Sequence, residues 1–480
     1  MLFNSLEFAA FLPIFFAAYW LLSKRVVVWQ NLLVVAGSYF FYAQWRWEFL
    51  GLIVASTVID YSLGIAIARS LDGAKRKALL WASIGANLAM LGMFKYAGFF
   101  VDSWIDLWRS LGFNMNERLW EIALPVGISF YTFQTLSYSI DVYRRKIEPT
   151  RDFVAYAAYV SFFPQLVAGP IERATNLLPQ FLKRREMNAD LAIDGFRQFA
   201  WGLFKKVVVA DNCGFYADGI FARADTHIGS VLALGVVYFA FQIYADFSGY
   251  SDMAIGTGKM LGIRLSVNFR YPYFSRDIAE FWRRWHISLS TWFRDYVYFS
   301  LGGSRCGTGR NVFNVMVVFV LSGFWHGASW NFVIWGSLNA LYFLPLLLMG
   351  RNRNHLDTVA EGKWLPSVVD FLRMACTFVL AGVAWVWFRA EDVTSALGYF
   401  KGLLSRSLFS LPLEMVHGLE RYAFEALLVV VMLLCFEWFS RSKEHPVQGR
   451  HANLVLAAVI FCTLVFGTFV KRSEFIYFQF

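Results

Sequence analysis

The chain has 480 residues, of which 58% are hydrophobic, 19% are aromatic and only 16% are charged. A soluble domain has about a quarter of its residues charged, so this composition excludes an ordinary soluble protein and indicates one that crosses a membrane many times. The net charge is +10. In a membrane protein such a balance reports cytoplasmic loops and anionic headgroups, and we expect no nucleic-acid partner.

Apolar segments of roughly membrane-spanning length recur along the whole chain. We predict them near 7–23, 26–44, 48–69, 78–101, 121–142, 152–171, 195–217, 229–249, 311–323, 329–349, 366–388, 422–440 and 452–470. The segment at 311–323 is too short to cross as a straight helix. Two prolines and a glycine interrupt Phe162–Pro170, which predicts a re-entrant segment, because broken backbone is tolerated in a membrane only where protein shields it.

The N-terminal stretch "MLFNSLE" lacks the positive region of a cleavable signal. The first positive charges, Lys24 and Arg25, follow the first apolar segment. Positive loops stay in the cytoplasm. We therefore expect the first helix to be retained, with the N-terminus on the outer side of the membrane.

The five cysteines are scattered, and no CxxC or CxxH spacing occurs among them. The histidines show no HxxxH or HExxH pattern either. These spacings favour packing cysteines over a disulfide framework, and we expect no metal site.

The motif "YADFSGYSDMAIG", Tyr244 to Gly256, comes at the end of an apolar segment and contains Asp246, Ser248 and Asp252. One interpretation is a helix end capped at the membrane interface. The other is a polar wall of a cavity. The motif lacks the second glycine of GxSxG, so it is not a nucleophile elbow.

Residues 264–310 contain eight arginines and three acidic residues. Read as one helix, the segment from Phe281 to Phe299 presents an aromatic stripe. It is then either an amphipathic helix lying on anionic headgroups, or part of a site whose arginines meet an anionic ligand arriving from the cytoplasm. Arginine suits the second function because its planar guanidinium binds phosphate with two hydrogen bonds.

The motif "FWHGASW" lies inside Asn311–Gly350, a run of 40 residues without Asp, Glu, Lys or Arg. Its His326 is either a packing residue or a catalyst, and ionisable groups buried in membranes are usually functional. Gly323 and Gly327 are expected to weaken the helix and open space beside the ring. Burial should keep the imidazole neutral, the form that a general base needs.

Together these motifs resemble the membrane-bound O-acyltransferase (MBOAT) family, and most closely its bacterial alginate O-acetylation branch. The stretches that carry the resemblance are "LPVGISFYTFQTLSYSIDVYR" (124–144), "FFPQLVAGPIER" (162–173), "DFSGYSDMAIG" (246–256), "FWRRWHISLSTWFRDYVYFSLGG" (281–303) and "GFWHGASWNFVIWG" (323–336). The resemblance covers most of the chain and keeps the order of the motifs, whereas the last hundred residues match more weakly.

The resemblance implies an all-α, polytopic integral membrane protein, with a ring of roughly 11–13 membrane helices around a central tunnel. Re-entrant and amphipathic segments would complete it. It implies one domain over 1–480, with a motif-bearing core at 121–349. The expected location is the bacterial inner membrane, with multiple crossings and a periplasmic N-terminus.

The resemblance also implies an O-acetyltransferase that moves an acetyl group from a cytoplasmic donor, expected to be acetyl-CoA, through the tunnel to a cell-envelope or exported polysaccharide such as alginate. His326 would be the catalytic base and His286 a second site histidine. Residues expected at the donor site or tunnel are Arg283, Arg284, Arg294, Trp282, Trp285, Asp246, Ser248, Asp252, Trp325 and Ser329. No bound cofactor is expected, and a periplasmic SGNH-type acyltransferase or acetyl carrier would be the protein partner.

Three alternatives remain open at this point. A transporter or flippase for a lipid-linked sugar would bind its substrate without covalent chemistry, although no internal repeat of the kind found in many transporters is visible. A D-alanyl transferase of the same family would use a different acyl group. A non-catalytic scaffold for a polysaccharide synthase would not need His326.

Overall fold

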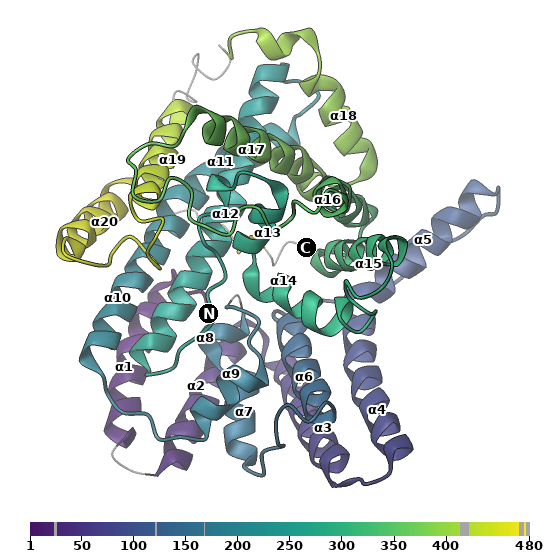
Figure 1. Cartoon of the computed structure of the whole chain (residues 1–480), viewed down its shortest axis with the longest axis vertical. Coiled ribbons are helices and arrows are strands. Elements are labelled where there is room, and N and C mark those ends of the chain that lie inside the picture. The colour runs from purple at the N-terminus through teal and green to yellow at the C-terminus, as the bar shows by residue number, and fades with distance from the viewer. Residues whose placement is uncertain (24–25, 121, 168, 413–421, 470–474, 477–480) are drawn as a thin grey trace. The chain divides into compact units, whose positions relative to one another are not determined.

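The structure, a computed structural model, describes residues 1–23, 26–120, 122–167, 169–412, 422–469 and 475–476. All regular secondary structure in these ranges is helical (Figure 1), which confirms the predicted all-α class. The chain packs as two compact units. Unit 1 contains Met1–Gly195 and Ala254–Ser266, and unit 2 contains Phe196–Met253 and Val267–Phe480. The prediction of one domain with a core at 121–349 stays a prediction.

Unit 1 holds the N-terminal helices, and its first three follow the predicted apolar segments closely. The helical elements of unit 1 are α1 (Leu6–Ser23), α2 (Val27–Arg46), η1 (Trp47–Phe49), α3 (Leu50–Arg69), α4 (Gly73–Leu91), η2 (Gly92–Tyr96), α5 (Ala97–Ser110), α6 (Ile128–Tyr143), α7 (Phe153–Ser161), α8 (Phe163–Leu166) and α9 (Ala174–Phe181). Two longer helices, α10 (Ala189–Phe204) and α12 (Gly229–Met260), have residues in both units.

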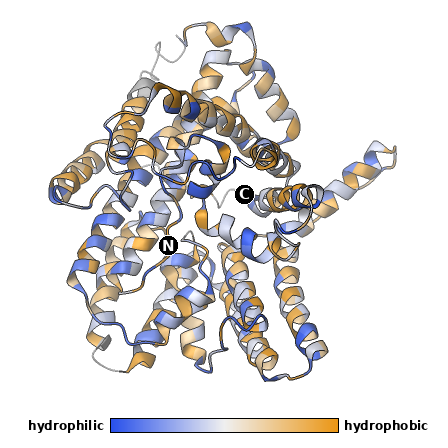
Figure 2. Ribbon diagram, in the orientation of Figure 1, coloured by the Kyte–Doolittle hydropathy of each residue, from blue (hydrophilic) through white to orange (hydrophobic). Residues whose placement is uncertain are grey.

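Five helical stretches of the described chain are long and apolar enough to cross a membrane: Val27–Arg69, Gly73–Ser110, Gly229–Met260, Trp330–Leu348 and Val368–Arg389. Figure 2 shows hydrophobic residues distributed along the long helices. The chain is therefore polytopic, as predicted. The helix count, the tunnel and the outer N-terminus stay predictions, and Lys24 and Arg25, on which the orientation rests, lie outside the described residues.

The predicted interruption in Phe162–Pro170 is confirmed. Helix α7 ends at Ser161, Phe162 adopts φ −51° and ψ 105°, and the single turn α8 follows. Gly127 begins α6 with a positive φ of 76°, and a Cβ atom there would lie against the Leu166 carbonyl oxygen. A glycine is needed at this position both for the left-handed backbone and for the close approach.

Unit 2 contains the remaining helices. They are η3 (Lys205–Ala210), α11 (Asp211–Ala222), η4 (Pro272–Phe274), α13 (Ile278–Arg284), α14 (Ile287–Phe293), η5 (Arg294–Tyr298), α15 (Thr308–His326), α16 (Trp330–Leu348), α17 (Val368–Arg389), α18 (Val393–Leu403), η6 (Arg406–Phe409), α19 (Tyr422–Phe439) and α20 (Ala452–Phe466). Three of the η elements, η2, η3 and η5, are π-helical turns. Such turns are frequent near functional sites.

The charge-free run forms most of a tight hairpin of α15 and α16, and one expectation about it was wrong. The apolar segment at 311–323 is part of a 19-residue helix that continues to His326, but this helix is not among the candidate membrane spans of the described chain, so its inability to cross alone stays a prediction. Gly323 does not open space. A Cβ there would collide with the backbone of α16 at Phe332, and one at Gly336 would collide with the Phe319 carbonyl. These glycines instead let two helix backbones touch, and α15 and α16 pack together more extensively than any other pair.

The interpretation of Phe281–Phe299 as one helix was also wrong. Helix α13 ends at Arg284, and His286 has φ 43° and ψ 55° before α14 begins. The backbone of a distant loop replaces the missing helical hydrogen bonds. The Ile287 N–H donates to the Asn268 carbonyl at 2.9 Å, and the Arg270 N–H donates to the Arg284 carbonyl at 3.0 Å. Side-chain periodicity could not reveal this loop.

One interpretation placed the motif Tyr244–Gly256 at the end of a helix. The motif instead lies within α12, which continues to Met260. Asp246, Ser248 and Asp252 are therefore interior helix residues. A capping role is excluded for them because the helix continues for two further turns beyond the last of the three.

Candidate active site

The structure brings the two motif histidines together inside unit 2. His326 is the last residue of α15, and His286 lies in the break between α13 and α14. Their ring centroids are 6.3 Å apart. The residues are 3% and 1% exposed, respectively. Sequence reasoning placed both residues at one site, and their proximity agrees with that expectation.

Aromatic side chains surround His326. Trp325, Trp335 and Phe388 have ring centroids 5.0, 5.1 and 5.3 Å from its own, all steeply inclined to it. These rings come from α15, α16 and α17. They shield the imidazole of His326 from solvent, in line with its 3% exposure.

His286 has a different set of neighbours. Phe247 on α12 packs edge-on at 4.7 Å, and Trp325 lies 5.9 Å away. Its Nδ1 is 3.0 Å from Oδ1 of Asn268, a residue with no exposed surface. Burial lowers the pKa of His286 to about 3. The ring is therefore neutral at every physiological pH, and it can accept a hydrogen bond.

Three other predicted residues form a layer behind the histidines. Trp285 packs against Trp385 at 4.9 Å, and Trp282 packs against Trp335 at 5.6 Å. Ser329 accepts a hydrogen bond from the Asn331 N–H and caps α16. These residues hold the walls of the site, and within the described chain none of their hydrogen bonds or ring contacts reaches an imidazole.

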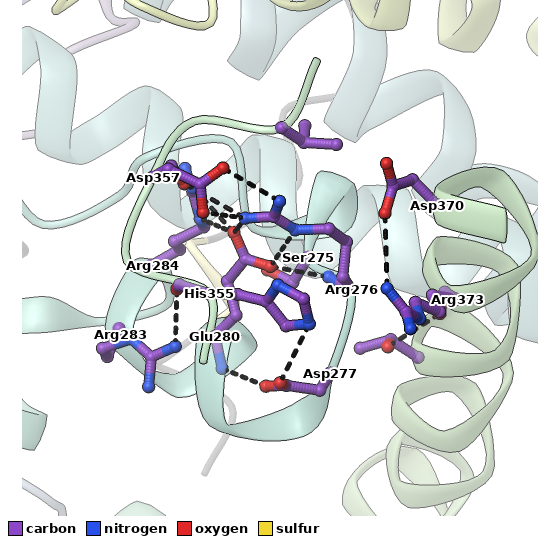
Figure 3. A network of polar contacts seen from close by, with 12 residues as sticks. Ser275, Arg276, Asp277, Glu280, Arg283, Arg284, His355, Asp357, Asp370 and Arg373 are labelled. Carbon is purple, nitrogen blue, oxygen red and sulfur yellow. Dashed lines mark hydrogen bonds and ion pairs between the residues drawn. The ribbon is translucent and has the colours of Figure 1, made fainter. Parts of the chain in front are cut away.

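The arginine network, which we define as Arg276, Glu280, Arg284 and Asp357, lies at α13, directly before His286 in the chain (Figure 3). Glu280 is 1% exposed and pairs with both Arg276 and Arg284, at 3.0 and 2.8 Å. Arg276 also binds Asp357 at 2.9 Å, which holds the pKa of that carboxyl below its usual range. Positive and negative charges are therefore matched here.

The two remaining arginine positions differ in accessibility. Arg283 donates to the carbonyl oxygens of Asn352 and His355, at 2.6 and 2.8 Å, and so binds the loop between α16 and α17 (Figure 3). Arg294 has a side chain 54% exposed and pairs with the adjacent Asp295 at 2.7 Å. Of Arg283, Arg284 and Arg294, the last is the best placed to meet a ligand from solution.

The acidic residues of α12 belong to a separate cluster. Asp252 pairs with Lys205 at 2.6 Å, and Asp246 pairs with Lys206 at 2.9 Å. Ser248 accepts a hydrogen bond from Lys205 at 2.9 Å. Gln198 also donates to Asp252, and the Ile476 N–H donates to Asp246. Within the described chain, none of these polar contacts runs to either histidine. Such pairing neutralises charges that would be costly inside a membrane protein.

Sequence reasoning missed several residues that shape the site, namely Asn268, Phe247, Trp335, Trp385 and Phe388. Four of these are aromatic residues in apolar helices that contain many others, so no local signal separated them. Asn268 stands in "SVNFR", inside the basic stretch. Its polar side chain between apolar neighbours was a signal, although only the fold reveals its partner.

A hairpin whose first helix ends in the buried His326, with the neutral imidazole of His286 beside it, is an arrangement suited to proton transfer. The sequence profile of MBOAT, the membrane-bound O-acyltransferase family, matches residues 144–381. The chain belongs to this family and is a multi-pass membrane O-acyltransferase, which confirms the resemblance seen in its motifs.

Individual members of the family with named activities are also similar to this chain. The chain is 42% identical to probable alginate O-acetylase AlgI of Azotobacter vinelandii, over 84% of this chain and 78% of that protein. It is 39% identical to the protein of the same name from Pseudomonas aeruginosa, over 94% and 84%. It is 33% identical to the peptidoglycan O-acetyltransferase of Helicobacter pylori, over 100% and 98%. The roles of the individual site residues stay predictions.

Proposed function

We propose that this protein transfers the acetyl group of acetyl-CoA toward hydroxyl groups of an exported or cell-envelope polysaccharide, with alginate as the first candidate. The relatives that share about 40% identity with it are named alginate O-acetylases. The peptidoglycan O-acetyltransferase is more distant in identity but matches over the full chain. Acetylation of a polysaccharide is common to both names.

The observation that carries this proposal is the pair of buried imidazoles, 6.3 Å apart, within aromatic walls. An acceptor hydroxyl is a weak nucleophile until a base removes its proton. His326 takes that proton as the hydroxyl oxygen attacks the thioester carbonyl. The carbon–sulfur bond then breaks, the acetyl group stays on the oxygen, and the thiolate receives the proton from His326.

The size of the expected catalytic effect follows from general acid–base chemistry. A positioned base contributes about 10²–10⁴ in rate. The aromatic walls add positioning and exclude water, which would otherwise hydrolyse the thioester. His286, the second imidazole of the site, supports the proton transfer that His326 performs.

The donor side of the proposal rests on charge. Acetyl-CoA carries several phosphate charges and cannot cross a bilayer, so it must enter from the cytoplasm, where positive side chains can receive it. Arg294 is the exposed member of the predicted set. Arg283 and Arg284 donate hydrogen bonds to backbone carbonyls of the α16–α17 loop, and so hold that loop in place.

The proposal includes a location and partners. The protein lies in the bacterial inner membrane with its N-terminus in the periplasm. A periplasmic SGNH-type acyltransferase or acetyl carrier receives the acetyl group and passes it to the polysaccharide. No cofactor remains bound to the enzyme between turnovers.

The test uses purified full-length protein in lipid nanodiscs, with radiolabelled acetyl-CoA, a periplasmic extract as the source of the partner, and alginate oligosaccharides or peptidoglycan fragments as acceptors. Wild type should release CoA and label one acceptor class, and His326→Gln should do neither. His445→Gln is the matched control, because His445 is also buried at 1% exposure but lies outside the site. Full activity of His326→Gln at normal protein level, or labelling only from a D-alanyl donor, would overturn the proposal.

A further inference from the structure

The side chain of Asn268 determines which nitrogen of His286 carries the proton. Oδ1 of Asn268 accepts hydrogen bonds from the backbone N–H of Ser288 at 3.3 Å and from the Ser288 hydroxyl at 2.9 Å. A backbone N–H can only donate. The amide atom that faces it must therefore be the oxygen, which removes the usual ambiguity in the orientation of an asparagine.

The same oxygen faces Nδ1 of His286 at 3.0 Å. Because an amide oxygen only accepts, Nδ1 must carry the hydrogen. A neutral imidazole has one N–H, so Nε2 is left with its lone pair. That atom is buried and has no hydrogen-bond partner among the described residues. The arrangement resembles the way a second group orients an imidazole base in hydrolases.

The backbone of Asn268 serves the same geometry. Its carbonyl accepts the Ile287 N–H at 2.9 Å, directly after the left-handed His286. A residue with a Cβ atom is rarely found at a φ of 43°, and such a conformation persists only where its surroundings enforce it. Asn268 therefore holds both the backbone on one side of the ring and the ring itself.

We infer that Asn268 is a positioning residue of the reaction: it holds His286 in the Nδ1–H tautomer, so that the lone pair of Nε2 is available to His326 once His326 has taken the proton. This inference rests on the proposed function. Because the ring centroids are 6.3 Å apart, too far for a direct hydrogen bond, Nε2 stabilises the imidazolium of His326 through one bridging water, and so strengthens His326 as a base.

Besides Asn268, few groups around His286 could determine which of its ring nitrogens carries the proton. Phe247 on α12, Phe269 beside Asn268 and Trp325 on α15 contribute rings without titratable groups. Among the rings that contact His286 in the described chain, that of His326 carries the titratable group. The nearby Arg284 points to Glu280 at 2.8 Å and belongs to the arginine network.

The direct test is solid-state nitrogen NMR of histidine-labelled protein in nanodiscs. The signal of His286, assigned by its loss in His286→Gln, should report a protonated Nδ1 and an unprotonated Nε2. Asn268→Leu should produce a mixture of tautomers or the Nε2–H form. A protonated Nε2 in wild type would overturn the inference, and this readout does not depend on turnover. It therefore fails separately from the proposed function.

Kinetics provide the second test. Asn268→Leu should lower kcat at least about tenfold, in the way that a wrong tautomer disables an imidazole base, with the KM for acetyl-CoA unchanged. Asn268→Asp retains an acceptor for both partners, so it should restore most of kcat. Its added negative charge favours protonation of His286, which should displace the acidic limb of the pH–rate profile toward higher pH.

The matched control is Asn314→Leu. Asn314 has no exposed surface and donates to the Leu301 and Gly303 carbonyls, away from both histidines. It should leave the pH profile and the His286 signal unchanged. If Asn268→Leu does not fold, the wild-type spectrum and the kinetics of Asn268→Asp still test the inference. Wild-type kcat and pH profile in a folded Asn268→Leu would overturn the inference.

Discussion

Two polar clusters lie next to each other along the chain, and they treat charge in opposite ways. In the arginine network, each of the four charged side chains meets an opposite charge within hydrogen-bonding distance. At the histidine site, His286 and His326 are surrounded by rings, and Nε2 of His286 has no hydrogen-bond partner among the described residues. The paired charges of the arginine network stabilise the fold, whereas the unpaired lone pair of His286 Nε2 can take part in proton transfer. The comparison therefore predicts different consequences of substitution in the two clusters.

The largest expected effect is on stability, in the arginine network. Glu280→Ala leaves two partly buried guanidinium groups without their shared carboxylate, which should cost about 3–5 kcal/mol. The measurement is thermal unfolding in nanodiscs, together with activity per folded molecule. Stability should fall while the residual folded enzyme keeps its kcat.

The control for this prediction is the double variant Glu280→Ala/Arg276→Met, which also removes one of the stranded charges. It should recover part of the lost stability. An unchanged unfolding temperature in Glu280→Ala would show that the network contributes little, and the contrast between the clusters would then collapse.

The next largest effect is on rate, at the histidine site. His326→Gln should reduce acetyl transfer by about 10² or more without changing the unfolding temperature, because glutamine retains bulk but is no base near neutral pH. His286→Gln should be milder. The double variant should be scarcely slower than His326→Gln, since residues that act as a unit are not additive.

The assay for these variants is turnover of acetyl-CoA, with cellular acetyl ester content measured against membrane protein level. Rate losses that simply multiply in the double variant would mean that the two imidazoles act independently. Near-normal transfer by His326→Gln would return that residue to a packing role.

A third prediction concerns pH. An exposed histidine has a pKa of about 6.5, and His286 in the folded protein has one of about 3. Since the unfolded chain takes up the proton first, the stability contributed by His286 falls as the pH drops below about 6.5 and continues to fall toward 3. The loss should be on the order of 2 kcal/mol at pH 5.

The measurement is the unfolding temperature of wild type and His286→Gln between pH 8 and pH 5. The wild type should lose more stability over this interval than the variant does. Parallel curves would mean that His286 is hydrated or otherwise able to accept a proton in the folded state.

The smallest effect is expected at Arg294, which separates ligand binding from structural pairing. Arg294→Gln should raise the KM for acetyl-CoA only a few fold, because exposed ion pairs are worth about 0.2–1 kcal/mol. Arg283→Gln and Arg284→Gln should lower the unfolding temperature as well, since both hold backbone carbonyls.

Lys401→Gln, an exposed change on α18, serves as the control for Arg294. It should leave donor affinity unchanged. Equal donor affinity in wild type, Arg294→Gln and the triple variant with Arg283→Gln and Arg284→Gln would exclude these arginines from the donor site.

The sequence was sufficient for the class, the family and many of the helices. Composition predicted a polytopic membrane protein, and motif order predicted the family, because both depend on residues that are local in the chain. His326 stood out because no other ionisable side chain occurs near it in a long apolar run. The break at Phe162 was visible through its prolines and glycine.

The errors came where distant segments override local periodicity. Nothing near His286 indicated that the backbone of Asn268 and Arg270 would replace a turn of helix there. Arg283 and Arg284 were expected at a donor site because the backbone carbonyls that they contact, in the loop between α16 and α17, lie about seventy residues away in the chain. Gly323 suggested open space until the fold placed another backbone against it.

The left-handed backbone of His286 has an evolutionary consequence. At a φ of 43°, glycine or asparagine would suit the chain better than histidine does. Selection for folding alone would therefore drive this position away from histidine, and only selection for the imidazole opposes that drift. A lineage that kept the membrane scaffold but abandoned acyl transfer should lose this ring early, and its replacement by glycine would mark the loss of chemistry before any change in the helices.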